Sequence, residues 1–454
     1  MGSPRSSQAS RAIIALALVL VAAHLAIAIK TAIALGQMYV SDEVWYVEAA
    51  RNLANDFGIV PGGAQCATVP LRLDNVTVLP VQILKNVCDQ LNLSCSLYGR
   101  NDTMAWVCGD PDAILAMLYA LHLPARFGWR YSSDRSADIL FYYNWEHPPL
   151  FKYWLIVAIA ILDNPYVWRA VPIIVSTVTM ILAIYAAYRV AGPAVATIAG
   201  IILLFSPAFN SLSSVAMLDI GVALSLAALL AIYAAYRDEA PDWLIGIALG
   251  IGISIKWTAF FNFLAAATLW GWRKTLRSAV VAGAIYAGVY VPLVAKYGFM
   301  TMVRETLWAL QWHTMAKCIG PRCPPPSAPW DWFFANHIFT MYLSPRLVLQ
   351  PSLTPFLPIL VFTYLFLRLL ARMWSEVDTV AFAAFVAPWL GYVLLYLVGD
   401  ITQYSYYTAH LAPGLAIAAA IALRHAPSLV SREALENLGQ IVKMVRAVVK
   451  SRHR

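Results

Sequence analysis

Long apolar segments dominate this chain and limit it to folds that a lipid bilayer can hold. Crossing a hydrocarbon core of about 30 Å takes about 20 mainly apolar residues in a helix. Of all residues, 61% are hydrophobic and only 12% are charged, which excludes a soluble globular enzyme, a disordered chain and a small disulfide-stabilised protein. We therefore predict an all-α polytopic membrane protein. The candidate spans are residues 12–35, 170–188, 194–209, 213–236, 243–256, 257–272, 278–296, 355–371, 378–398 and 404–424.

The number of crossings depends on the apolar run Phe151–Leu162. A helix of this length reaches only about 18 Å, which is too short to cross. As a re-entrant or juxtamembrane helix it leaves ten crossings and a basic cytoplasmic tail at residues 425–454; as a span it makes eleven and puts the tail outside. The positive-inside rule favours ten. The net charge of +8 then reflects topology, and we predict no binding to nucleic acid.

This topology divides the chain into segments with different surroundings. A cytoplasmic N-terminus at residues 1–11 precedes an uncleaved first span at 12–35, because 24 apolar residues exceed the apolar region of a signal peptide. The main bundle follows at 169–296 and the C-terminal helices at 354–424. The large exterior segments are residues 36–168 and 297–353.

Each exterior segment carries structure of its own. Residues 56–138 are polar, with strand-like patches at Thr68–Leu73 and Val76–Leu79 and a helical stretch at Asp112–Leu121. They predict a small mixed α/β domain inserted between the first and second spans. In the other segment, residues 302–315 place Trp308 and Trp312 at i and i+4, which is typical of an interfacial helix.

The cysteines support an exterior location for these segments. None of the six lies in an apolar segment, which predicts disulfides in an oxidising compartment. We expect Cys318 to pair with Cys323, whereas the first four cysteines allow three connectivities. Zinc is the alternative, but their spacings contain no C-x2-C. Glycosylation triplets begin in the same stretch at Asn75, Asn92 and Asn101. The first four cysteines are Cys66, Cys88, Cys95 and Cys108.

Two adjacent acids, Asp42 and Glu43, follow the first span directly. Adjacent carboxylates at the exterior membrane surface suit a base that acts on a membrane-bound substrate. Alternatively, Ser41 or Asp42 caps a helix over Glu43–Leu53, since acids stabilise a helix N-terminus. The two interpretations are compatible.

Further ionisable residues lie where apolar surroundings make them costly. Each such residue costs roughly 2.5–3.5 kcal/mol in the membrane, so it should line a cavity or pair with another. A salt bridge between Asp219 and Lys256 is one such pairing. Cations at the bilayer edge also suit a lipid phosphate, and a nearby carboxylate suits removal of a proton from a hydroxyl. The residues are Glu146, His147, Lys152, Arg169, Asp219 and Lys256.

In this order along the chain, these residues resemble the protein O-mannosyltransferase family. The matching motifs are Asp42-Glu43, His147-Pro148-Pro149-Leu150-x-Lys152, Arg169, Met217-Leu218-Asp219 and Gly252-x-x-x-Lys256-Trp257-Thr258, with a weaker echo at Tyr406-Tyr407-x-x-His410-x-x-Pro413. Phe151 stands where the family usually has glycine, and residues 297–353 are too short for the carbohydrate-binding domain of eukaryotic members. The resemblance implies the GT-C fold, with about 10–11 transmembrane helices.

The resemblance also implies an inverting glycosyltransferase that moves a hexose, mannose in that family, from dolichyl or polyprenyl phosphate. The acceptor would be a protein Ser or Thr hydroxyl on the exterior face of the cell membrane. Asp42 would be the general base, Glu43 would place the acceptor and Arg169 would contact the donor phosphate. The residues expected to support the donor pocket are His147, Lys152, Lys256 and His410, with Glu146 and Asp219 beside them.

Two alternatives remain open at this point. The sugar acceptor is a glycolipid or a cell-surface polymer, or the chain is a transporter that uses the same charges to bind a lipid-linked sugar. Neither a P-loop nor an HExxH or GxSxG motif supports a different chemistry. We predict no required cofactor and no metal site, because the donor phosphate is already activated and cations are available. A divalent ion held by Asp42 and Glu43 is the alternative, although the two acids do not make a full ligand set.

Overall fold

The computed structural model describes residues 4–63, 65–73, 76–99, 101–123, 126–132, 138–314 and 324–431, and in the tail Glu436, Gln440, Lys443 and Met444. Three predictions therefore fall on residues outside this description. They are the pairing of Cys318 with Cys323, the acceptor triplet at Asn75, and most of the basic tail.

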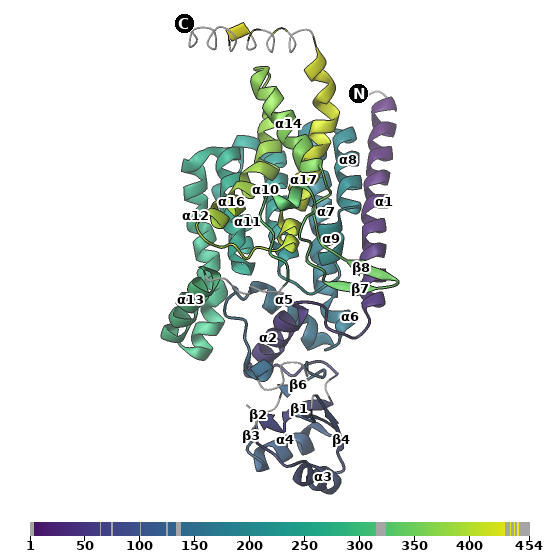
Figure 1. Ribbon diagram of the computed structural model, residues 1–454, viewed down its shortest axis with the longest axis vertical. Helices are drawn as coiled ribbons and strands as arrows, with labels where there is room; N and C mark the ends of the chain where they lie inside the picture. Colours follow the sequence, from purple (N-terminus) through teal and green to yellow (C-terminus); the bar gives the residue numbers. More distant parts are fainter. Residues whose placement is uncertain are drawn as a thin grey trace.

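A bundle of long apolar helices forms the body of the molecule (Figure 1). Within the described residues, six helical stretches are long and apolar enough to cross a membrane, so the predicted helical membrane protein is confirmed. They are Ile13–Leu35, Pro165–Ala191, Asp219–Glu239, Trp257–Tyr297, Glu376–Leu397 and Ser405–Leu429. The helices that build them are α1 (Pro4–Leu35), α6 (Pro165–Trp168), α7 (Ala170–Ala191), α10 (Asp219–Tyr236), α12 (Asn262–Tyr297), α15 (Glu376–Ala381), α16 (Ala387–Leu397) and α17 (Thr408–His425).

Shorter apolar helices fill the rest of the bundle. They are α8 (Pro193–Leu204), α9 (Pro207–Leu212), α11 (Asp242–Ile255) and α14 (Leu357–Leu370). The helical stretch 257–297 breaks at Gly271, whose φ of 77° only glycine adopts without strain, so the predicted segments 257–272 and 278–296 are separate helical runs. The predicted segment 213–236 also differs, since residues 213–218 are not helical and Asp219 opens α10.

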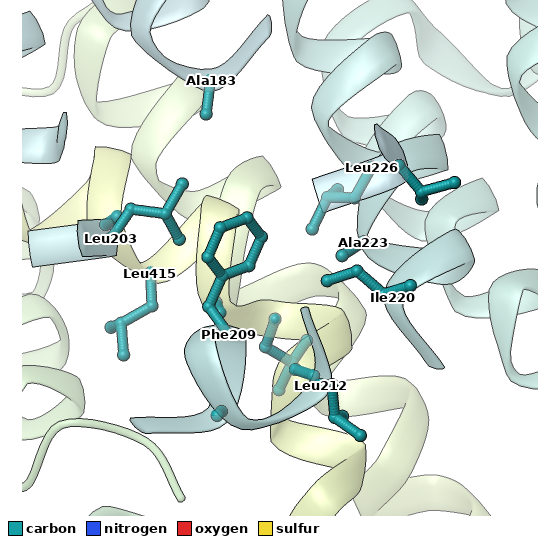
Figure 2. Packing of buried hydrophobic residues seen from close by; sticks show 14 of the residues in the cluster. Ala183, Leu203, Phe209, Leu212, Ile220, Ala223, Leu226 and Leu415 are labelled. Atoms are coloured by element: carbon teal, nitrogen blue, oxygen red, sulfur yellow. The ribbon is translucent and has the colours of Figure 1, made fainter. Parts of the chain in front are cut away.

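The core lies where α7, α8, α9, α10 and α17 meet (Figure 2). Phe209 of α9 is fully buried among leucine, isoleucine and alanine side chains of the other helices. At Gly414 of α17 an added Cβ would lie 1.8 Å from the carbonyl oxygen of Ala384, so only glycine permits this approach. The close packing buries α17 almost completely and brings His410 into the interior.

The predicted mixed domain is present and follows α2 (Glu43–Asp56). Its four-stranded antiparallel sheet has the order β4-β5-β1-β6, and helices follow β1 and β5. This order and connectivity make a βαββαβ unit of the ferredoxin-like type. The strands and helices are β1 (Cys66–Pro70), β2 (Arg72–Leu73), β3 (Val76–Thr77), α3 (Val81–Gln90), β4 (Ser94–Tyr98), β5 (Met104–Cys108), α4 (Pro111–Ala120) and β6 (Arg126–Phe127).

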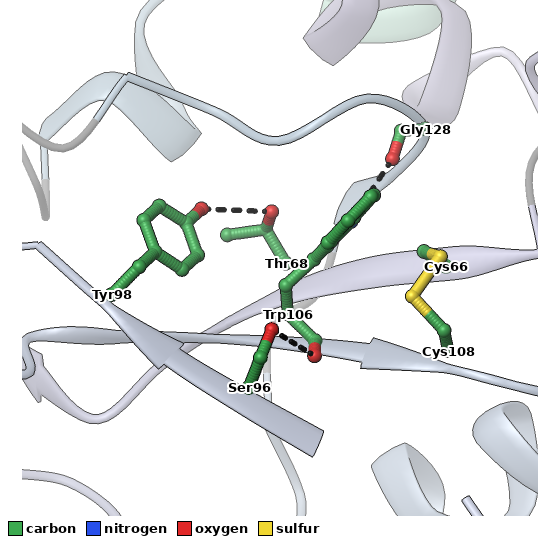
Figure 3. Close-up of a disulfide and its surroundings, with 7 residues drawn as sticks. All are labelled: Cys66, Thr68, Ser96, Tyr98, Trp106, Cys108 and Gly128. Carbon is green, nitrogen blue, oxygen red and sulfur yellow. Dashed lines mark hydrogen bonds between the residues drawn. A yellow bond between two sulfur atoms is a disulfide. The ribbon is translucent and has the colours of Figure 1, made fainter. Parts of the chain in front are cut away.

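Two disulfides hold this insertion together. One joins Cys66 of β1 to Cys108, its cross-strand partner in β5 (Figure 3). The other joins Cys88 to Cys95. Of the three connectivities that the sequence allowed, the structure has this one, and the paired thiols are not available to zinc. Among the described residues, no group of three or more His, Cys, Asp or Glu side chains is placed to hold a metal ion.

The insertion marks one end of the molecule. In Figure 1, α2, α5 (Leu150–Ile161) and α13 (Phe299–Thr314) lie at this end, with the hairpin β7 (Tyr342–Ser344) and β8 (Leu347–Leu349) nearby. The ten-crossing prediction requires both ends of the chain on one side, and the start of α1 and the end of α17 do lie together at the opposite end. The number of crossings itself stays a prediction.

Candidate active site

An aromatic cavity of about 630 Å³ lies at the insertion end of the bundle. Its walls come from the start of α2, residues 142–147, α13 and residues 404–407. No lysine or arginine is among the described residues that line it. Apolar and aromatic walls with a few polar groups are typical of a small-molecule site. The lining residues are Asp42, Trp45, Tyr46, Tyr142, Asn144, Glu146, His147, Trp308, Trp312, His313, Pro324, Phe339, Tyr404, Tyr406 and Tyr407.

Asp42 is placed at the N-cap of α2, but its side chain does not cap the helix. The carboxylate lines the cavity instead, and the Tyr406 hydroxyl donates a hydrogen bond of 3.4 Å to Oδ2. Ser41 has a φ of 54°, a left-handed conformation that is costly for serine and that sets the direction in which α2 begins. Burial, together with the negative charge of Asp219, raises the pKa of Asp42 to about 6. A carboxylate with such a pKa suits a general base near neutral pH.

Glu43 and Arg169 form a buried ion pair rather than a part of the cavity wall. Arg169 Nε and Nη2 donate to the two Glu43 oxygens at 2.9 and 2.7 Å, and both side chains have an exposed fraction of 0%. Glu43 also accepts from the backbone N–H groups of Val40 and Ala216. The guanidinium donates further to the carbonyl oxygen of Gly36 at 2.7 Å. The pair thus fixes the loop between α1 and α2, which carries Asp42.

Lys152 is buried and holds the segment that follows the insertion. Its Nζ donates to the carbonyl oxygens of Tyr143, Asn144 and His147 at 3.2, 2.6 and 3.0 Å. Asn144 adopts a left-handed φ of 56° within the same loop. Lys152 therefore shapes the cavity wall from behind.

The side chains of Glu146 and His147 both line the cavity. The Tyr142 hydroxyl donates to Glu146 Oε1, and the carbonyl oxygen of Glu146 bonds to Nε2 of His313 at 2.8 Å. The rings of His147 and His313 have centroids 5.3 Å apart. These contacts join the 142–147 loop to α13 across the cavity.

The predicted salt bridge between Asp219 and Lys256 is present, with Nζ 2.7 Å from Oδ1. The same oxygen lies 2.7 Å from Nε2 of His410, whose Nδ1 contacts the Tyr392 hydroxyl. This cluster is buried behind the cavity wall. Lys256 Nζ lies 4.3 Å from the ring centroid of Tyr407, and that ring lines the cavity. The interaction is a cation–π contact.

The structure thus brings Asp42, Glu146 and His147 together in the cavity and places the predicted cations behind or away from it. Sequence reasoning missed the contribution of α13. Trp308 and Trp312 stack with centroids 5.7 Å apart and line the cavity with His313. Their i, i+4 spacing was the available signal, but it equally fits a helix that lies on a membrane surface.

Residues 146–295 match the family model of dolichyl-phosphate-mannose-protein mannosyltransferases, as the motifs predicted. The matched segment contains His147, Lys152, Arg169, Asp219 and Lys256, and it begins after Asp42. A search of curated proteins gives no match.

Solved structures give a second comparison. ArnT from Cupriavidus metallidurans, bound to undecaprenyl phosphate, is similar with a TM-score of 0.51 and 14% identity over 97% of this chain. The chain has the GT-C fold. It spans 64% of the length of that ArnT chain.

Two further structures are less similar to this chain. The apo form of ArnT from the same organism has a TM-score of 0.48 and 12% identity over 98% of this chain and 64% of its own. The oligosaccharyltransferase of Archaeoglobus fulgidus, in the apo form, has a TM-score of 0.36 and 17% identity over 64% of this chain and 44% of its own.

Proposed function

We propose that this protein transfers a sugar from a polyprenyl- or dolichyl-phosphate donor to a hydroxyl group. The observation that carries the proposal is Asp42, a carboxylate that lines an aromatic cavity, makes one long hydrogen bond and has a pKa raised to about 6. The family match to residues 146–295 supports a lipid-phosphate sugar as donor.

The reaction needs one proton acceptor and one leaving group. Asp42 takes the proton of the acceptor hydroxyl while that oxygen bonds to the anomeric carbon. The bond from this carbon to the phosphate oxygen breaks with inversion, and its electron pair leaves with the lipid phosphate. General-base assistance of this kind is worth about 10²–10⁴-fold in rate.

The donor phosphate belongs, in this proposal, on the side of the cavity formed by Tyr407. The positive charge of Lys256 lies 4.3 Å behind that ring, and His147 lines the cavity from the 142–147 loop. Fixed positive charge in a poorly hydrated site stabilises charge that develops on a leaving group. Glu43, Arg169, Lys152, Asp219 and His410 have a supporting role, since they hold the backbone and the charge of Lys256 in place.

The finer assignments are mannose, a protein Ser or Thr acceptor and an exterior active site. The description of the matching family supports the first two. Two disulfides at the cavity end of the bundle support the third, because disulfides persist in oxidising compartments.

A reconstituted assay tests the proposal. The purified chain in liposomes is given dolichyl-phosphate mannose with a Ser/Thr-rich peptide or with a lipid extract, and products are identified by mass spectrometry. We expect mannosylated peptide from the wild type and about 10²–10⁴-fold less from Asp42→Asn. Asp89→Asn, which alters an exposed acid of α3, is the control. A mannosylated lipid among the products would instead identify a lipid or glycolipid as the acceptor. Movement of the donor across the liposome without its consumption would establish a transporter and overturn the proposal.

A further inference from the structure

Asp56, at the end of α2, binds three side chains that come from three separate parts of the chain. Its Oδ2 accepts hydrogen bonds from the hydroxyls of Tyr143 and Tyr297, at 2.6 and 2.7 Å. Its Oδ1 accepts from Nη1 of Arg126. Burial alone would raise the pKa of Asp56, but these hydrogen bonds outweigh it and hold the pKa below its usual value. The carboxylate therefore stays charged, and both of its oxygens accept hydrogen bonds.

Two of these partners, Tyr143 and Tyr297, adjoin segments of the chain that line the cavity. Tyr143 lies between Tyr142 and Asn144, which both line it. Tyr297 is the last residue of α12, and Gly298, with a φ of 88°, turns the chain into α13, which supplies Trp308, Trp312 and His313. The rings of Tyr143 and Tyr297 also pack edge to face, with centroids 5.6 Å apart.

The third wall is α2 itself, whose first turn follows Asp42 and whose last residue is Asp56. Asp56 is not among the residues that line the cavity. One carboxylate outside the cavity thus joins α2, the 142–147 loop and the joint between α12 and α13.

Arg126 brings the insertion into the same cluster. It lies in β6, the edge strand of the insertion sheet, and it also donates to the carbonyl oxygen of Leu140 and the hydroxyl of Tyr143, both at 3.0 Å. The neighbouring Asn55 of α2 binds β6 as another strand would, since its amide accepts from the N–H of Phe127 at 2.9 Å and donates to the carbonyl oxygen at 3.3 Å. The edge strand is therefore anchored to α2 at two consecutive residues.

We propose that Asp56 is a positioning residue that sets the three cavity walls relative to one another and to the insertion. The proposal rests on the proposed function for its effect on turnover, and on geometry alone for its effect on structure. Loss of the carboxylate charge weakens the contacts of α2 with Tyr143 and Tyr297. The 142–147 loop and the start of α13 are then held less firmly, although the amide of Asn52 in α2 still donates to the carbonyl oxygen of Tyr142 at 2.8 Å. A misplacement of about 1 Å in a catalytic site costs about 100-fold in rate.

Hydrogen exchange of the purified full-length chain tests the structural part, with no substrate needed. In Asp56→Asn we expect faster exchange in peptides that cover residues 142–147 and 299–314. Tyr297→Phe removes a single hydroxyl, so we expect faster exchange in 299–314 only, and this variant decides the matter if Asp56→Asn does not fold. The control Asp89→Asn should match the wild type in both segments.

Turnover of the same variants tests the functional part. Asp56→Asn should lower kcat by roughly tenfold to a hundredfold, with a smaller change in KM. Unchanged exchange in both segments, or an equal increase over all peptides, would overturn the positioning role whether or not the protein transfers sugar. Altered exchange without any turnover in the wild type would leave Asp56 as the link between the walls and count against the proposed function alone.

Discussion

Asp42 and Glu43 are neighbours in sequence but differ in almost every physical respect. Glu43 is fully buried and accepts four hydrogen-bond contacts, two from Arg169 and two from backbone N–H groups. Asp42 is only partly buried, and its carboxylate lies on the cavity with one contact of 3.4 Å to Tyr406. Asp42 is the N-cap of α2 and Glu43 is its first residue, so one side chain serves the site while the next serves the scaffold.

The two carboxylates differ chiefly in their hydrogen-bond partners. A buried acid that is fully hydrogen-bonded is a structural element, whereas an acid with few partners in a poorly hydrated site has a raised pKa and can take up a proton.

The largest effect is expected from Asp42→Asn. The amide keeps the shape of the carboxylate but cannot accept the acceptor's proton, so kcat should fall by about 10²–10⁴-fold. Turnover with saturating donor measures this, and the midpoint of thermal unfolding should stay at the wild-type value. Retained turnover would assign the base to another residue.

The next effect concerns stability. Arg169→Met leaves Glu43 buried without its partner, which should lower the free energy of unfolding by about 3–5 kcal/mol. Chemical denaturation measures the loss, and the double variant Glu43→Met with Arg169→Met should recover much of it. If Arg169→Met instead has wild-type stability and no longer binds polyprenyl phosphate, Arg169 contacts the donor, as the family resemblance implied.

The pH dependence of kcat should report Asp42 directly. Because its pKa is raised to about 6, a growing fraction of Asp42 is protonated below that pH and cannot act as a base. The rate should fall about tenfold per pH unit on the acid side and level off above it. An acid limb near the ordinary pKa of aspartate, about 4, would mean that the carboxylate is well solvated.

The smallest effect is expected from Tyr406→Phe. The hydroxyl donates to the charged carboxylate and so lowers the pKa of Asp42, against the larger effect of burial. Its removal should move the acid limb upward by less than about one pH unit. Tyr166→Phe, on the surface of α6, is the matched control, and a shift in both variants would speak against a specific contact.

Much of the architecture could be predicted because hydropathy and cysteine placement are local properties of the sequence. Every predicted apolar segment coincides with helix in the structure, apart from short breaks such as residues 205–206 and 213–218. The positions of the cysteines also predicted the insertion and the presence of disulfides in it. Which cysteines pair could not be predicted, because the Cys66–Cys108 disulfide depends on the register of β1 against β5.

The site was harder to predict because its partners are far apart along the chain. Arg169 meets Glu43 across 126 residues, and Asp56 meets Arg126, Tyr143 and Tyr297 across 70, 87 and 241. A sequence reveals which charged residues are expensive but not which of them meet. The cations expected at a phosphate are thus engaged within the scaffold, and Trp308 and Trp312 face the cavity instead of lying only against lipid.

The insertion leaves the helical framework at Asp56 and is bound again to α2 by Arg126 and Phe127. The residues at which the insertion begins and ends are thus neighbours, joined by side-chain hydrogen bonds. Domains with adjacent ends can be exchanged without rerouting the host chain. This part of the molecule is therefore modular: a different domain that keeps the same pair of contacts can be grafted onto α2 while the membrane framework stays constant.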